Sequence, residues 1–224
     1  MARVTGETLK RIIIDYLVNG YSNGLKQSSI ERYLRDARNE PWFSRIKIPK
    51  REIVGVISDT HIPFEHPNYL KFCVDTFKRY GVTRVVHIGD LVDNHAISRH
   101  QSETSAMSAE SEYAVALKRV GLWTKAFPKL TLCTGNHDLI PHTQAATLGM
   151  PEPFLKTLRE LWMLPKGWNI VPEVIIDGVY YFHGIGSTGK TPAYNRMANN
   201  RMSTVQGHTH SRFGVAYHAN PTNI

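Results

Sequence analysis

Side chains able to bind metal ions recur in five short blocks between residues 59 and 210, and each block follows an apolar stretch. The blocks are Asp59-Thr60-His61, Gly89-Asp90-Leu91-Val92-Asp93, Gly135-Asn136-His137-Asp138, His183-Gly184 and Gly207-His208-Thr209-His210. Carboxylate, imidazole and amide groups form a mixed oxygen and nitrogen site, which suits Mn²⁺, Fe, Zn²⁺ or Ni²⁺. A set of about seven such ligands is too many for one tetrahedral ion and too few for two closed octahedra, so it fits two ions that share a bridging carboxylate and leave positions for water.

The spacing within the blocks indicates how these side chains are presented. Asp59 and His61 are two residues apart, as are His208 and His210, so each pair projects to one side of an extended chain. Neighbouring glycines allow the backbone to approach a bound ion or phosphate closely. Ligand sites in α/β sheets gather at the carboxyl ends of the strands, where the loops converge. We therefore expect the five blocks to meet there.

Short apolar strands alternate with helical patterns from residue 52 onward. The pattern predicts helices over 67–80, 108–127 and 153–163, and strands over 52–58, 84–88, 129–133, 168–176, 179–183, 203–206 and 213–218. Strand–helix alternation followed by strand-rich sequence is typical of a layered α/β protein with some antiparallel character.

The first 50 residues form a basic leader that differs from the rest of the chain, 51–224. Apolar stripes predict helices over 8–18 and 28–38, joined by a turn-rich segment, and 39–51 is typical of a linker. The pair resembles a helix-turn-helix unit, although a helical cap has the same pattern. Residues 1–51 hold 11 Lys and Arg against 5 Asp and Glu, so +6 of the net +8 lies there. This favours DNA or RNA as a partner, the alternative being a solvated basic face.

Composition limits the class of protein. The 224 residues are 42% hydrophobic and 21% charged, as in a globular protein. No apolar run is long enough to span a membrane, and the N-terminus lacks a signal-peptide pattern, so we expect a cytoplasmic protein. Cys73 and Cys133 are predicted to be buried free thiols. Oligomeric state cannot be predicted.

The blocks DTH, GDLVD, GNHD, HG and GHTH resemble, in that order, the five signatures of the calcineurin-like metallophosphoesterase superfamily over about residues 52–212. The resemblance implies a four-layer α/β/β/α sandwich with a centre of two divalent ions, Mn²⁺ foremost, at one edge. The ligands implied for the first ion are Asp59, His61, Asp90 and His210. Asp90 would bridge to a second ion, whose further ligands would be Asn136, His183 and His208.

The same resemblance implies the catalytic groups. His137 would protonate the leaving oxygen, and Asp93 would hydrogen-bond its imidazole and favour the charged form. The GDxxDRG signature of protein phosphatases is not met, because Asn94 and His95 follow Asp93. This argues against a phosphoprotein substrate.

The missing arginine leaves the phosphate contact to other residues. Arg99 or Lys190 could replace it, and His95 could contact the metal site or the substrate. Asp138 is predicted to stabilise its loop. The remaining histidines, at positions 66, 87, 100, 142 and 218, are interpreted as ordinary hydrogen-bonding groups.

A second motif, Gly184 to Thr191, matches the phosphate-binding pattern G-x-x-x-x-G-K-T. We reject a P-loop because Pro192 follows where a helix is required, and because the last 33 residues contain no aspartate. Only 14 residues follow His210, so we expect a truncated or unusually compact chain.

Three functions fit these observations. The first is a metal-dependent phosphodiesterase of nuclease type that acts on nucleic acid or nucleotides, in a layout that loosely resembles bacteriophage metallophosphoesterases. The second is a phosphomonoesterase of small molecules, capped by residues 1–51. The third is a nucleic-acid-binding protein with a vestigial metal site, which the complete ligand set disfavours.

Overall fold

The computed structural model describes residues 6–19, 25–46, 52–99, 106–187, 189–211 and 213–217. The chain divides into two compact units, one of residues 1–51 with 214–224 and one of residues 52–213.

The N-terminal unit is a helical pair with its own small core. Helix α1 (Gly6–Ile14) continues as a π-helical turn (Asp15–Asn19), and α2 (Gln27–Ala37) is followed by a 3₁₀ turn, η2 (Phe43–Arg45). Both predicted helices therefore form. Residues 39–46 are part of this unit rather than a linker, because Trp42, Phe43 and Ile46 pack on the cluster of Leu9, Ile13, Tyr33 and Ala37. Residues 47–51 lie outside the described ranges.

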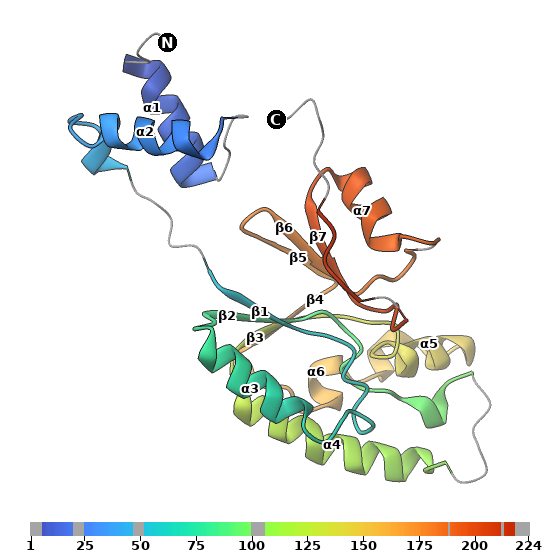
Figure 1. Ribbon diagram of the computed structural model, residues 1–224. Coiled ribbons are helices and arrows are strands. Elements are labelled where there is room, and N and C mark those ends of the chain that lie inside the picture. The colour runs from blue at the N-terminus through green and yellow to red at the C-terminus, as the bar shows by residue number, and fades with distance from the viewer. Residues whose placement is uncertain are drawn as a thin grey trace. The chain divides into compact units, whose positions relative to one another are not determined.

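The larger unit contains two sheets (Figure 1). Strands β1 (Val54–Ile57), β2 (Arg84–His87), β3 (Leu130–Cys133) and β4 (Trp168–Val171) pair in that order, all parallel. In the second sheet, β6 (Val179–Phe182) lies between antiparallel β5 (Glu173–Ile176) and parallel β7 (Ser203–Gln206). The predicted strand over 168–176 is thus two strands in different sheets, divided at Pro172, which cannot donate a ladder hydrogen bond.

Alternation along the strands builds a core on each face of the parallel sheet. Ile57, Val85 and Leu132 face helices α3 (Tyr69–Arg79) and α4 (Ala109–Ala126), which cover that face in Figure 1. Val56 and Val86 point the other way and pack against the second sheet. Because both faces are covered, these strands are mainly apolar rather than strictly alternating, as parallel strands are. The layers hold the strand ends in fixed positions.

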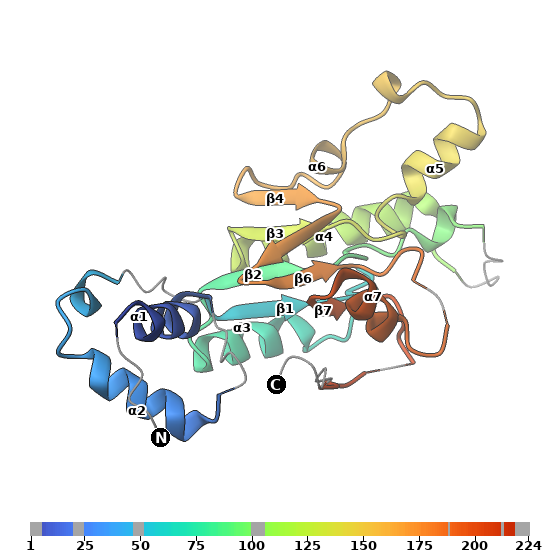
Figure 2. The same cartoon turned by 90° about the horizontal axis from the view of Figure 1, so that it is seen from above.

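Shorter helices follow the strands. Figure 2 shows α5 (Ile140–Thr147) and α6 (Leu158–Leu161) on an arm between β3 and β4, and α7 (Pro192–Asn200) beside β7. Two 3₁₀ turns complete the described elements, η3 (His95–Ile97) and η4 (Glu152–Phe154). The unit is an α/β protein with a parallel four-stranded sheet and flanking helices.

Several local predictions were wrong. The helix predicted over 153–163 is only η4 and α6, and α5 and α7 were not predicted. Helix α7 begins at Pro192, so a helix does follow the P-loop motif, contrary to our expectation. Residues 213–217 form no strand, and His218 lies outside the described residues.

Two other expectations are supported. Cys73 and Cys133 are free and buried. Among the described residues, no helix is long and apolar enough to cross a membrane.

Candidate metal centre

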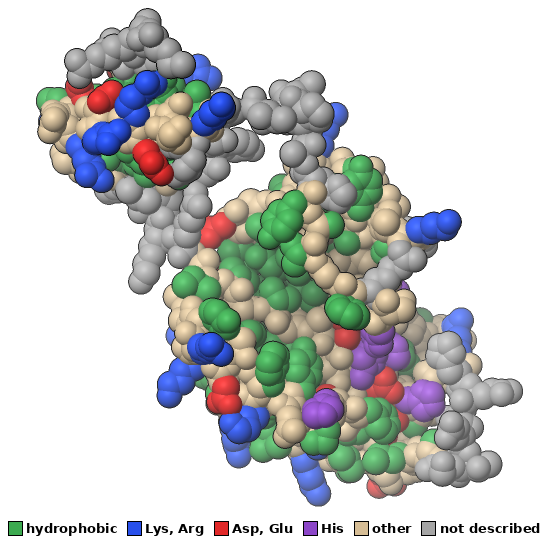
Figure 3. All heavy atoms as spheres, viewed as in Figure 1, with side chains coloured by type: hydrophobic (Ala, Val, Ile, Leu, Met, Phe, Trp, Pro, Cys, Tyr) green, Lys and Arg blue, Asp and Glu red, His purple; other side chains and the backbone are tan. Residues whose placement is uncertain are grey.

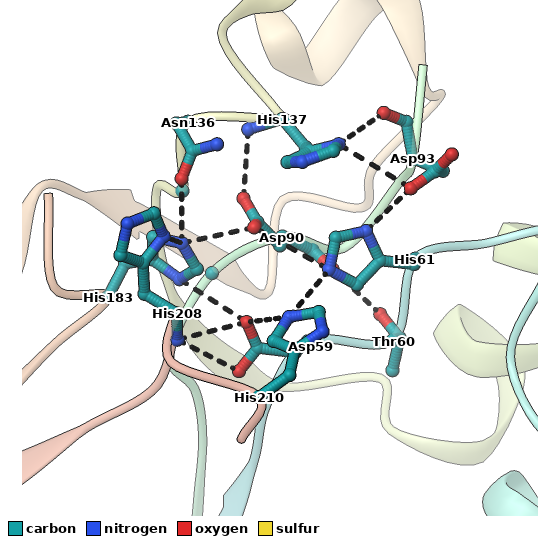
Figure 4. A network of polar contacts seen from close by, with 12 residues as sticks. Asp59, Thr60, His61, Asp90, Asp93, Asn136, His137, His183, His208 and His210 are labelled. Carbon is teal, nitrogen blue, oxygen red and sulfur yellow. Dashed lines mark hydrogen bonds and ion pairs between the residues drawn. The ribbon is translucent and has the colours of Figure 1, made fainter. Parts of the chain in front are cut away.

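The five sequence blocks meet at one edge of the larger unit (Figure 4). Asp59 and His61 follow β1, Asp90 follows β2, and Asn136 and His137 follow β3. The second sheet contributes His183 after β6, and His208 and His210 after β7. Parallel strands end at a common edge, so loops distant in sequence become neighbours.

The backbone is bent sharply at the polar residues of this edge. Asp59, His61, Asp90 and His208 have φ values of 48°, 48°, 52° and 71°, in the left-handed region that non-glycine residues rarely adopt. Backbone hydrogen bonds between the first two blocks, from Asp59 N to Gly89 O and from His61 N to Asp90 O, hold two of these bends. Such strain is tolerated where the surroundings fix the conformation, and it often marks functional sites.

Two glycines allow the blocks to approach. A Cβ at Gly135 would collide with the backbone nitrogen and carboxylate of Asp90, and one at Gly207 would collide with Ser58 and Asp59. Any larger residue at these positions would push the loops apart.

Asp59, His61 and His210 form the open group. His210 Nε2 lies 3.2 Å from Asp59 Oδ1 and 3.2 Å from His61 Nε2. The His210 side chain is 58% exposed and that of Asp59 15%. Ser58 Oγ donates to Asp59 Oδ2, and the His208 backbone N–H donates to Asp59 Oδ1 at 3.0 Å. The open group therefore has a solvent-accessible ligand.

Asp90, Asn136, His183 and His208 form the buried group. His183 Nε2 lies 3.0 Å from both Asp90 Oδ2 and Asn136 Oδ1, and 3.1 Å from His208 Nδ1. The side chains of His183 and Asp90 are 1% and 2% exposed. Asp90 Oδ2 also lies 3.6 Å from His61 Nε2, so this carboxylate stands between the two groups.

Hydrogen bonds orient two of the histidines. Asp93 Oδ1 lies 2.6 Å from His61 Nδ1, and Ile88 O lies 3.0 Å from His183 Nδ1. If each Nδ1 carries the proton, each Nε2 presents a lone pair to the centre, as in carboxylate–histidine–metal sites. Burial lowers the pKa of His61 and of His183. The hydrogen bond of His61 to Asp93 and that of His183 to Asp90, together with nearby negative charges, outweigh burial and raise both pKa values overall.

Asp138 ties the second and third blocks together. Its carboxylate is fully buried and accepts backbone N–H bonds from Gly135, Asp90 and Leu91 at 2.8–3.0 Å, and from Val92 at 3.3 Å. Burial raises the pKa of Asp138 to about 7, whereas the hydrogen bonds from Gly135 and Val92 oppose this shift. Four donors suit an ionised carboxylate, which can only accept. Asp138 thus stabilises its loop, as predicted.

His137 lies beside the open group, with its ring centroid 4.5 Å from that of His61. Its backbone N–H donates to Asp90 Oδ1 at 2.9 Å. Its Nδ1 lies 2.6 Å from the backbone oxygen of Asp93 and 3.5 Å from the Asp93 carboxylate. The Asp93 carboxylate is thus closer to His61 than to His137. The backbone oxygen of Asp93 is therefore the nearer partner of His137 Nδ1. This contact does not involve His137 Nε2.

The donor atoms fit two metal ions. Ligand atoms lie within 4.8 Å of one another in three overlapping sets: Asp59, His61 and His210; His61, Asp90 and His137; and Asp90, His183 and His208. Two nitrogens about 2.1 Å from one ion would be roughly 3.0–3.4 Å apart. The His61–His210 and His183–His208 separations of 3.2 and 3.1 Å meet this condition.

An open pocket of about 570 Å³ adjoins the open group and His137. Its remaining walls include Phe64, Glu65, His66 and Tyr69. Figure 3 shows histidine and acidic side chains gathered on this surface. Sequence reasoning missed Phe64, Glu65 and Tyr69, and it interpreted His66 as an ordinary hydrogen-bonding group. Their position just after the DTH block was the only available signal.

The three predicted substrate contacts are not brought to this pocket. His95, Arg99 and Lys190 are absent from the described residues that line it. The His95 backbone N–H is held by Glu112 at 2.8 Å. Substrate binding by these three residues stays a prediction.

The other histidines have separate outcomes. Burial lowers the pKa of His87 to about 3, and its Nε2 lies 3.0 Å from Thr60 Oγ1, so it is a neutral core histidine. His142 Nε2 lies 3.1 Å from the Lys156 carbonyl oxygen. His100 and His218 lie outside the described residues.

Comparisons with known proteins agree with this geometry. The profile of the calcineurin-like phosphoesterase family matches residues 53–213. The gene 54 protein of Mycobacterium phage D29 is 30% identical to this chain, and the match covers 74% of this chain and 71% of that protein. No solved structure matched the chain.

Proposed function

Because the chain belongs to the calcineurin-like phosphoesterase family, which implies a metal-dependent phosphoesterase, we propose that it is a phosphodiesterase of nuclease type acting on nucleic acid or nucleotides. The observation that carries the proposal is the convergence of two ligand groups on Asp90, which lies 3.0 Å from His183 and 3.6 Å from His61. The four-layer α/β/β/α arrangement belongs to the same proposal, with α7 as the outer layer beside the second sheet.

The open group, together with Asp90, would hold one ion. Asp90 would bridge to the second, held also by Asn136, His183 and His208. Two bound divalent ions, with Mn²⁺ the first candidate, supply activation of water and stabilisation of the charge that develops on the phosphate. Carboxylate and imidazole ligands suit Mn²⁺, Fe, Zn²⁺ and Ni²⁺ alike.

The chain's own residues would position the substrate and move the proton. With Nδ1 donating to the Asp93 carbonyl, His137 would carry the transferable proton on Nε2 and give it to the leaving oxygen. The Asp93 carboxylate, 3.5 Å from His137 Nδ1, would favour the charged imidazole. Asp93 would also orient His61, to which it is closer.

The N-terminal helical unit would contribute nucleic-acid binding, as its basic charge favours. Phosphate contacts by Lys and Arg make affinity fall steeply with salt. We expect the affinity of the full chain for random duplex or single-stranded DNA to fall steeply with salt. A variant lacking residues 1–46 should lose this salt-dependent binding. Salt-independent binding would remove this part of the proposal.

The test of the reaction is hydrolysis of bis-p-nitrophenyl phosphate beside p-nitrophenyl phosphate with added Mn²⁺. We expect the diester to be preferred and Asp90→Ala to abolish turnover. His137→Ala should lower kcat by less than the roughly 100-fold expected for a poor leaving group, because p-nitrophenolate departs with little help from a proton donor. Preference for the monoester would favour a phosphatase. No turnover with metal bound would contradict the proposal.

Metal content separates two roles for His137, because its ligand atom also lies near those of His61 and Asp90. As a proton donor, His137 can be replaced by alanine with both ions retained. Loss of one ion in His137→Ala would identify it as a ligand instead.

A further inference from the structure

The pocket beside the open group has two chemically different walls. One consists of groups assigned to the reaction: Asp59, His61, Asp93, His137 and His210. The other, formed by Thr60 and the residues Phe64, Glu65, His66 and Tyr69, has no role in that reaction. A volume of about 570 Å³ lies within the range of about 300–1,000 Å³ typical of small-molecule sites and exceeds what a phosphate group needs.

Phe64 presents an aromatic ring on the second wall. The residue is 52% exposed, although burial of such a ring would be favourable. Its backbone N–H donates to His61 O at 2.7 Å, so its position is tied to a proposed metal ligand. An exposed ring held next to a reaction centre is a surface on which a planar group can stack.

Glu65 adds an acceptor to the same wall. Its side chain is 3% exposed, and Oε1 is held by Arg119 at 2.7 Å. Oε2 is buried and has no hydrogen-bond partner among the described residues. A buried acceptor without a partner is costly, so an N–H donor that reached Oε2 would stabilise this side chain.

We propose that the second wall binds the nucleobase of a nucleotide whose phosphate lies at the metal centre, with the Phe64 ring stacking on the base. A nucleobase is planar and uncharged and carries at least one polar edge, which in thymine includes an N–H donor, and it is joined to the phosphate through one sugar. No Lys or Arg is among the described residues that line the pocket, so a second phosphate would find no cation there. The inference rests on the proposed function, since it requires a phosphate ester at the centre.

The test compares two ligands that differ in the base. Thymidine 5′-monophosphate and methyl phosphate are titrated calorimetrically into the Mn²⁺-loaded full chain. We expect the nucleotide to bind at least about tenfold more tightly, and Phe64→Ala to lower the ratio of the two affinities about tenfold, in keeping with base–aromatic stacking. Phe64→Trp should keep the ratio within about twofold, because it keeps a stacking surface.

Phe72→Ala is the matched control, because Phe72 is 63% exposed on α3 and lies outside the pocket; it should leave the ratio as in the wild type. Equal affinities for the two ligands in the wild type would overturn the inference. So would an equal loss of both in Phe64→Ala, which would mean that Phe64 only shapes the loop.

Turnover of bis-p-nitrophenyl phosphate by the same preparations separates the two proposals. If the protein hydrolyses the diester but binds the nucleotide no more tightly than methyl phosphate, the base-pocket proposal is wrong and the phosphodiesterase proposal stands. A Phe64-dependent preference without turnover keeps the base pocket and removes the proposed reaction.

Discussion

The two ligand groups of the centre differ in burial and in the contacts that hold their side chains. In the buried group, Asp90 and His183 are 2% and 1% exposed, and Asp138 fixes the loop of Asp90 through backbone hydrogen bonds. In the open group, His210 is 58% exposed and is held by side-chain contacts. Preorganisation by backbone hydrogen bonds does not depend on a bound ion, whereas an exposed side chain such as that of His210 loses freedom when an ion binds. We therefore expect the buried group to be the stronger site and the open group to be where ligands exchange.

The largest effect is expected from Asp138→Asn, which tests the comparison between the two groups. An amide keeps one acceptor oxygen but turns an NH₂ group toward backbone N–H donors, so buried donors lose their partner. We expect a loss of about 2–4 kcal/mol in the free energy of unfolding, seen by circular dichroism as a fall in Tm of roughly 5–15 °C. Affinity for both ions should fall too, because Asp90 would be a ligand of both.

Asp75→Asn is the control, because Asp75 is 62% exposed and pairs with Lys71 on α3; such a surface change should alter Tm by only about 1 °C. If Asp138→Asn melted like the wild type, the buried group would not depend on this clamp, and the contrast between the groups would fail.

A smaller effect is expected from His210→Ala, which removes the exposed ligand only. Loss of a partner behind a metal ligand typically costs about 10–100-fold in affinity, so loss of the ligand itself should cost at least about 100-fold at one ion. Mn²⁺ titration should show one tight and one weakened site, with Tm little changed. A matched His183→Ala variant should weaken the tight site instead. Equal weakening of both ions by His210→Ala would show that the groups are not separable.

The contrast between the groups could only partly be predicted from the sequence. The ligand blocks and their order were visible, because metal binding restricts the residue types and the strands place them at a common edge. The strands of the parallel sheet were also visible, since Val56, Val86 and Leu132 lie in short, mainly apolar stretches. Burial was not visible, because His183 and His210 are the same residue type in similar glycine-containing blocks, and their exposure depends on which layers pack over them.

Other features depended on tertiary contacts. The split at Pro172 places β4 and β5 in different sheets, and an apolar run cannot show that division. Helix α7 begins at Pro192 because proline suits the first turn of a helix, although the same residue looked like a helix breaker in the sequence. Apart from its position just after the DTH block, nothing in the sequence indicated that the Phe64 ring is exposed, since an exposed ring and a buried one have the same sequence pattern.

The smallest effect is expected from a change at Asp93, which separates a role through His61 from a role through His137. The Asp93 carboxylate lies 2.6 Å from His61 Nδ1 and 3.5 Å from His137 Nδ1. Asp93→Asn keeps an oxygen for His61 and leaves the backbone carbonyl that holds His137. If Asp93 mainly orients His61, the variant should lower Mn²⁺ affinity at the open group by about tenfold or less, and Asp93→Ala should lower it further.

The leaving group distinguishes this role from the charging of His137. A lost proton donor matters more for a poor leaving group, so His137→Ala should slow phenyl esters more than p-nitrophenyl esters. If Asp93→Asn lowers kcat for both classes by the same factor at saturating Mn²⁺, its carboxylate acts through His61 and the open group. If instead it reproduces the leaving-group dependence of His137→Ala, the longer 3.5 Å contact is the one that matters for catalysis. The open group would then be held without help from Asp93.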